Sequence, residues 1–122
     1  MTPDQRRPAR VCAPKQPVNE VFASLASPDW KLNFDVLEFD LDQMALLDYT
    51  GLWDDVNERC GTHIDLYEEA KIAPAGLGGL IECLERARAG AADLEYVTAQ
   101  LDRLRALAET ARALGVPVVF LF

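Results

Sequence analysis

The C-terminal part of the chain constrains the fold most, because a long helical pattern there runs directly into an apolar strand. Between residues 93 and 114, apolar side chains recur at alternating spacings of three and four residues, which predicts a helix with one buried face. These side chains are Leu94, Val97, Leu101, Leu104, Ala108 and Ala111. Gly115 and Pro117 are stop signals for that helix. Residues 116–122 are β-branched and aromatic, as expected of a buried strand.

A second strand is predicted in the first half of the chain. Apolar residues alternate from residue 31 and then shift by one position before residue 39, which is typical of a strand with a bulge. We expect this strand to pair with residues 116–122 in a small sheet that has the helices on one face. Residues 62–72 have no long period and predict a loop or a short edge strand. The prediction is a mainly helical α+β single domain whose small sheet includes the C-terminal strand.

Four shorter helices are predicted before the long one. The first is expected to run through Val21, Phe22 and Leu25, with Asn19 as its cap and Ser27-Pro28 as its stop. Asp40 with Gln43 three residues later resembles a capping box, so a short helix is expected to begin there. Residues 52–60 show helical spacing, and Gly61 stands where a left-handed C-terminal cap is expected. Residues 74–90 predict a helix with proline in its first turn.

The length and composition of the chain predict one domain with a short N-terminal extension. The 122 residues, 50% of them hydrophobic, suffice for a single continuous core. Residues 1–17 are polar and proline-rich, so they are expected to be an extended or disordered lead-in that adds little to the core. Residues 18–122 are expected to form the domain.

The charge of the chain restricts its partners. The formal net charge is −8, from 20 acidic and 12 basic residues, and a field of that sign repels nucleic-acid phosphates and anionic lipid surfaces. A basic protein partner would be complementary, although the same charge also serves solubility. No apolar run is long enough to span a bilayer. We therefore expect neither a nucleic-acid partner nor a membrane.

The three cysteines, Cys12, Cys60 and Cys83, include no Cys-x-x-Cys pair and cannot all form internal disulfides. This pattern favours a reducing, cytoplasmic environment. No apolar segment of the signal-peptide type follows the arginines near the N-terminus.

Candidate catalytic and cofactor-binding patterns are incomplete. His63 lies near Asp65, Glu68 and Glu69, but the spacing lacks the His-Glu-x-x-His or cysteine pattern of a zinc site. A solvated polar loop is the favoured interpretation, so no catalytic residue, metal ligand or cofactor is predicted.

Two further patterns fail on specific positions. The acidic residues from Asp40 to Asp48 resemble part of a calcium loop, but Ala45 stands where such a loop needs glycine. The glycines at 76, 78 and 79 match neither a dinucleotide fingerprint nor a phosphate-binding loop. Close packing or a flexible helix start explains these glycines better.

Three segments together resemble those of a known family. They are Trp53 with Cys60-Gly61-Thr62-His63-Ile64-Asp65-Leu66-Tyr67, then Leu80-x-x-x-Leu84, then Leu101-x-x-Leu104-x-x-Leu107-Ala108 ending at Gly115 before the terminal strand. In this arrangement the chain resembles small bacterial immunity proteins, which neutralise a cognate toxin delivered by contact-dependent or type VI secretion systems. The resemblance implies a cytoplasmic, non-enzymatic inhibitor that covers the active-site cleft of a toxin or an adjacent surface.

The leading hypothesis is therefore an immunity-type protein that binds a cognate toxin with a basic surface. The residues expected to contact that partner are acidic and aromatic: Trp53, Asp54, Asp55, Glu58, Asp65, Tyr67, Glu68 and Glu69. Two other classes stay open. One is a small hydrolase or nucleotide-binding enzyme that uses His63 and the nearby carboxylates. The other is an oligomerisation module in which the helix at residues 93–114 mediates self-association.

Overall fold

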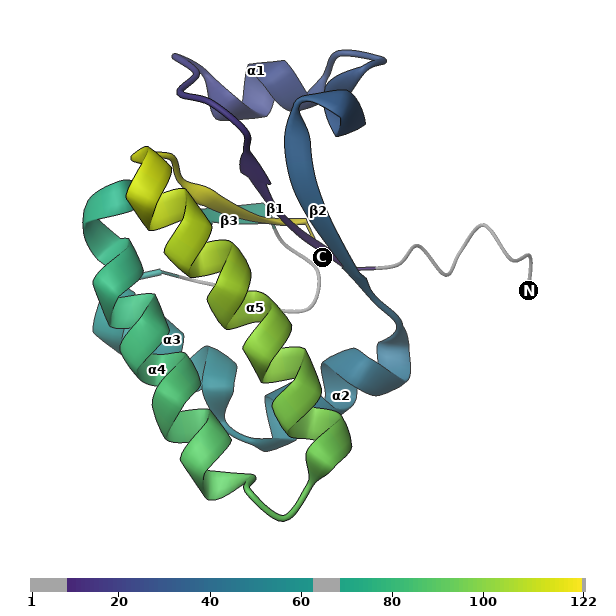
Figure 1. Cartoon of the computed structure of the whole chain (residues 1–122), viewed down its shortest axis with the longest axis vertical. Coiled ribbons are helices and arrows are strands. Elements are labelled where there is room, and N and C mark those ends of the chain that lie inside the picture. The colour runs from purple at the N-terminus through teal and green to yellow at the C-terminus, as the bar shows by residue number, and fades with distance from the viewer. Residues whose placement is uncertain (1–8, 63–68, 122) are drawn as a thin grey trace.

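The computed structural model describes residues 9–62 and 69–121, which form one α+β domain, as predicted. Its strands are β1 (Ala9–Pro14), β2 (Phe34–Phe39), β3 (Glu69–Ile72) and β4 (Val118–Leu121). Its α-helices are α1 (Val21–Leu25), α2 (Leu41–Tyr49), α3 (Leu52–Cys60), α4 (Leu77–Gly90) and α5 (Glu95–Leu114). Two short 3-10 turns, η2 (Trp30–Leu32) and η3 (Pro74–Gly76), precede β2 and α4 (Figure 1).

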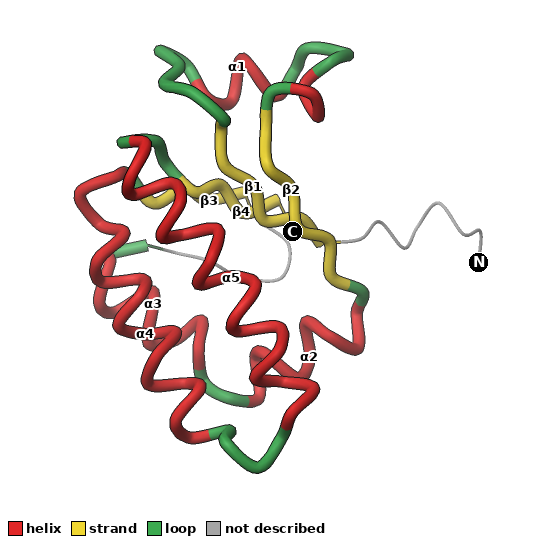
Figure 2. The backbone as a smooth tube through the Cα atoms, in the orientation of Figure 1, coloured by secondary structure: helices red, strands yellow, loops and turns green. Residues whose placement is uncertain are grey.

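The four strands form one antiparallel sheet in the order β2-β1-β4-β3. The predicted pairing of the strand near residue 36 with the terminal strand is wrong, because β1 lies between them. Val11 of β1 is in register with Leu37 of β2 on one side and with Phe120 of β4 on the other. Figure 2 shows β1 running beside β2. The first strand of the chain is thus an interior strand of the sheet.

The N-terminal segment contributes to the core, contrary to the sequence prediction. Within residues 9–14, the side chains of Val11, Cys12 and Ala13 are at most 2% exposed. This apolar run is short and lies between prolines, so it has neither a helical nor a strand period. An interior strand covered on both faces need not alternate, which is why the pattern gave no signal.

Both faces of the sheet are covered, by layers of unequal size. Helices α2 to α5 lie over one face and enclose the main core, with α5 in contact with β1, β2 and β4 (Figure 1). On the other face, α1 and η2 cover a smaller cluster of Cys12, Val21, Phe34 and Val119. The prediction that helices pack on one face holds for the main layer and misses this second one.

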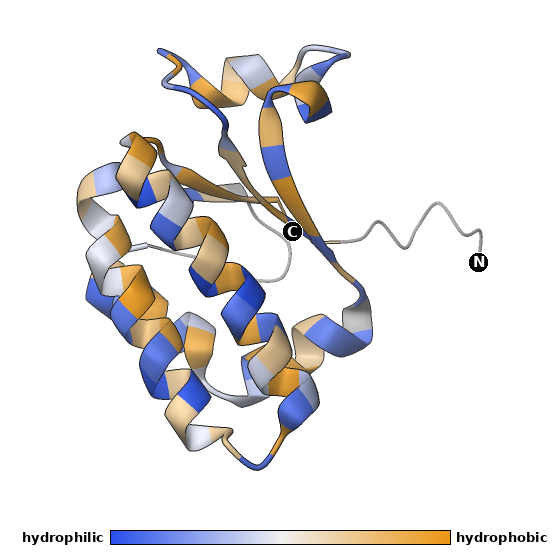
Figure 3. Ribbon diagram, in the orientation of Figure 1, coloured by the Kyte–Doolittle hydropathy of each residue, from blue (hydrophilic) through white to orange (hydrophobic). Residues whose placement is uncertain are grey.

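The long helix and the terminal strand are confirmed. The buried residues of α5 include Val97, Leu101, Leu104, Ala108 and Ala111, whereas Leu94 precedes the helix and is 53% exposed. Figure 3 shows hydrophobic and hydrophilic residues interspersed along this helix. Gly115 ends it with a φ of 71°, a left-handed conformation that glycine adopts without strain. On its outer side, Arg105 and Glu109 form an ion pair at 3.0 Å.

The start of α2 and the end of α3 also follow the sequence signals. Gln43 N donates to Asp40 Oδ1, and Asp40 N donates to Gln43 Oε1, each at 2.8 Å, which completes the predicted capping box. Gly61 ends α3 with a φ of 67°.

The predicted bulge is absent from β2, because all six of its residues pair with β1 in continuous register. The residues before β2 form η2 instead of extending the strand.

Two glycines of the predicted close-packing group adjoin neighbouring side chains. A Cβ at Gly76 would lie 2.9 Å from Ile72 Cγ2, and one at Gly79 would lie 3.3 Å from Arg59 Cγ. Around Gly78 the nearest atom is 3.9 Å away, which is an ordinary contact. Close packing therefore explains Gly76 and Gly79, and not Gly78.

Candidate functional site

The described residues contain no group of three or more histidine, cysteine or acidic side chains placed to hold a metal ion. His63, Asp65, Tyr67 and Glu68 lie outside the described residues, and only the backbone of Glu69 is described, in β3. Cysteine chemistry is disfavoured at two positions, because burial raises the pKa of the Cys12 thiol to about 12 and that of Cys83 to about 11.

The acidity of the chain is concentrated in one segment. From residue 32 to residue 58 the sequence contains no lysine or arginine. The same segment contains the acidic residues Asp35, Glu38, Asp40, Asp42, Asp48, Asp54, Asp55 and Glu58. It comprises β2, α2 and α3, so the fold gathers these carboxylates along one sheet edge and the helices that follow it.

Part of this acidity is unneutralised and exposed. Asp42 and Asp48 on α2, and Asp54 and Glu58 on α3, are exposed and have no ion pair among the described residues. Their mutual repulsion is therefore relieved only by solvent and salt, which makes this surface attractive to a cationic partner.

An aromatic and an aliphatic side chain lie on the same helix as two of these carboxylates. Tyr49 is 89% exposed and Leu46 is 39% exposed, and the two are three residues apart on α2. Residues at that spacing share a helix face. Tyrosine is enriched at binding hot spots, so Tyr49 is a candidate anchor that the sequence prediction missed. The sequence carries no clear signal for Tyr49, because apolar and polar residues are only weakly separated around α2.

The predicted contact residues of α3 differ in their exposure and in their partners. Asp54 and Glu58 are exposed. Trp53 is 3% exposed and packs edge-on against Phe120 with ring centroids 5.8 Å apart, so its ring belongs to the core and is not a surface contact. Asp55 accepts bonds from Arg86 on α4 at 2.8 to 3.1 Å, so it joins two helices of the domain.

Strand β2 lies at one edge of the sheet, next to β1 alone. It is six residues long, has no bulge and contains no lysine or proline; its charged residues are the two acids Asp35 and Glu38, which disfavour an acidic strand but not a basic one. Its Val36 and Leu37 are half-buried. The outer side of β2 thus offers backbone donors and acceptors for a further strand.

A groove of about 390 Å³ runs beside this edge, between β2 and α5. Its lining residues are Asp35, Leu37, Arg103, Ala106, Leu107 and Thr110. Arg103 is already engaged, because its guanidinium lies 5.1 Å from the centre of the Phe39 ring and donates to Gln100 Oε1 at 2.6 Å. A strand added to β2 would place alternate side chains over the apolar floor formed by Leu37, Ala106 and Leu107.

Comparison with family models, curated proteins and solved structures finds no match for this chain. Within the described residues, no helix combines the length and apolar character needed to cross a membrane.

Proposed function

We propose that this chain is a cytoplasmic, non-enzymatic immunity-type protein that binds a cognate antibacterial toxin through a basic surface of the toxin. The observation that carries the proposal is the open β2 edge, with its groove, inside a segment that has eight acidic residues and no basic one. An edge of this kind offers main-chain pairing, and the surrounding carboxylates select a cationic partner.

The binding mode follows from the arrangement of the segment. A basic extended segment of the toxin adds to β2 and places apolar side chains in the groove beside Leu37 and Leu107. The surface of α2 and α3, with Tyr49 among its carboxylates, then contacts the rest of the basic cleft. Enzymes that act on RNA, DNA or nucleotides have basic clefts, so covering such a cleft prevents entry of the anionic substrate.

Other features support this class of function over the alternatives. All three cysteines are free thiols, which is consistent with a reducing compartment. The apolar face of α5 is buried within its own domain, so that face is not available for self-association. An enzyme centred on His63 stays the competing hypothesis. His63 lies outside the described residues, so the structure does not test it.

Charge reversal on α2 and α3 is expected to abolish protection. A bacterial host would express a candidate cognate toxin domain, with or without this chain, and growth would be measured. The variant Asp48→Lys/Asp54→Lys/Glu58→Lys moves the formal net charge from −8 to about −2. Association with the purified toxin at low salt should slow by about ten- to a thousandfold, because steering is lost. Asp55 is left intact because it binds Arg86.

The matched control is Asp29→Lys/Asp93→Lys/Glu95→Lys, which makes the same charge change at exposed residues outside the acidic segment. It should retain protection and most of the association rate. Equal behaviour of the two triple variants would exclude the α2 and α3 surface. Failure of the native chain to protect, together with a metabolic operon around the gene, would favour the enzyme hypothesis.

Filling the groove is expected to weaken binding independently of charge. Ala106 is exposed and lines the groove, so Ala106→Trp would occupy the space that an added strand needs. We expect dissociation of the toxin complex to accelerate by at least about tenfold, since a blocked pocket acts mainly on the dissociation rate. Ala89→Trp on α4, also exposed and away from the groove, is the control. Unchanged dissociation of the Ala106 variant would contradict strand addition at β2.

A further inference from the structure

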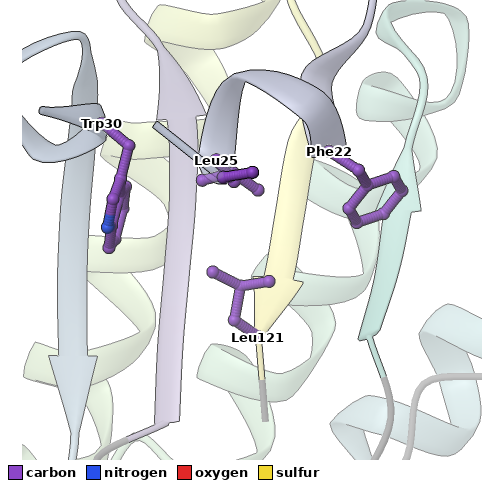
Figure 4. A pocket seen from close by; sticks show the side chains of 5 residues that line it. Phe22, Leu25, Trp30 and Leu121 are labelled. Carbon is purple, nitrogen blue, oxygen red and sulfur yellow. The ribbon is translucent and has the colours of Figure 1, made fainter. Parts of the chain in front are cut away.

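A second hollow, separate from the acidic segment, lies between α1 and the outer face of the sheet. It has a volume of about 330 Å³ and is lined by Phe22, Leu25, Ala26, Trp30 and Leu121. Figure 4 shows Trp30 and Phe22 on either side of Leu25, with Leu121 projecting from β4 toward Leu25 of α1. Every lining residue is apolar or aromatic, so a ligand portion in this pocket must be apolar too.

The walls of the pocket are held in place by neighbouring packing. The Trp30 ring packs edge-on against Phe34, with ring centroids 6.0 Å apart, and Leu25 and Leu121 adjoin the buried cluster under α1. Phe22 remains 38% exposed at the mouth. Because α1 has only five residues, it covers the sheet incompletely and leaves this space open on one side.

Two lysine side chains lie over the aromatic residues of the pocket wall. Lys71 Nζ lies 5.8 Å from the centre of the Phe22 ring, and Lys31 Nζ lies 5.7 Å from the centre of the Trp30 ring. Neither lysine has an ion pair among the described residues, although the chain is strongly acidic. Arg10 also lies over Trp30, at 5.9 Å, but it is neutralised by Glu38 at 2.9 Å.

We propose that this pocket binds a small single-chain amphipathic anion, of the medium-chain carboxylate class. The apolar tail fills the hollow, and the carboxylate lies at its rim beside one of the two lysines, either Lys31 next to Trp30 or Lys71 next to Phe22. The volume is near the lower end of ligand pockets, which run from about 300 to 1,000 Å³, so one short chain fits better than a two-tailed lipid. The inference is independent of the toxin partner.

The test is a titration of the purified chain with decanoate below its critical micelle concentration. Trp30 fluorescence and isothermal titration calorimetry report binding, and Trp53 is buried away from the pocket. We expect saturable binding of one decanoate per chain. The cationic amphiphile decyltrimethylammonium should bind at least about tenfold more weakly, because the lysine at either end of the pocket repels its head group.

Two matched pairs of variants locate the site. Ala26→Phe fills the pocket and should abolish decanoate binding, whereas Ala23→Phe, exposed on the same helix but outside the lining, should not. Lys31→Gln/Lys71→Gln should weaken binding about three- to tenfold at low salt, because exposed charges contribute modestly. Lys15→Gln replaces the remaining lysine of the chain and should have no effect on decanoate binding.

Three results would overturn the proposal. They are absence of saturable decanoate binding, equal binding of the anionic and cationic amphiphiles, and unchanged binding in the Ala26 variant.

A further experiment uses vesicles of phosphatidylglycerol and phosphatidylcholine. Binding to these vesicles without binding of monomeric decanoate would identify a membrane surface as the source of the anion and would also overturn the single-ligand site.

Discussion

Deletion of residues 116–122 is expected to unfold the domain. These residues include Val116, Val118, Val119 and Phe120, all at most 1% exposed. Burial of each such side chain is worth about 1.5–3 kcal/mol, and the total is comparable with the free energy of unfolding of a small domain, about 5–15 kcal/mol. The deletion also removes the strand that pairs with both β1 and β3. Circular dichroism during thermal unfolding is expected to show no cooperative transition.

Pro117→Ala provides the comparison for this deletion. Pro117 precedes β4 and is half-buried, so its replacement leaves the strand in place and should shift the midpoint only modestly. A deletion variant that keeps a cooperative transition near that of the full chain would show that β4 is dispensable.

Val11→Asp is expected to be almost as damaging. Val11 is 1% exposed and lies between Leu37 and Phe120 in the middle of the sheet. A carboxylate there has no described cation to pair with, so the free energy of unfolding should fall by about 4 kcal/mol or more. Urea unfolding followed by circular dichroism measures this loss.

The control is Lys15→Asp, in the same N-terminal segment but exposed and beyond the end of β1. Its cost should stay within about 0.5 kcal/mol, as for most surface substitutions. Similar free energies of unfolding for the two variants would mean that β1 lies outside the core. That is what the sequence predicted for residues 1–17.

The candidate site could be predicted only in part from the sequence. The acidic character of α3 and the exposure of Asp54 and Glu58 follow from helical spacing, because apolar positions mark one face and leave the other to solvent. The same spacing could not place Trp53, whose size suits both a core and a binding surface. Tyr49 was missed because α2 is too weakly amphipathic to show which of its apolar residues point outward.

Local structure was determined by the sequence itself. The capping box at Asp40, the left-handed cap at Gly61, the helix stop at Gly115, the helix α5 and the apolar strand β4 were all correctly predicted. Each depends on interactions within a few residues: a side chain that bonds a nearby backbone amide, a glycine free to adopt positive φ, or a hydrophobic period along one element.

Only the tertiary structure decided which strands are neighbours and which surfaces remain open. The interior position of β1, the free edge of β2 and the pocket beneath α1 depend on contacts between residues distant in the sequence. An apolar run such as Val11 to Ala13 is compatible with several pairings, since its side chains are satisfied by any apolar neighbour. The choice follows from assembling the whole core, in which β4 pairs with β1 and leaves β2 at the edge.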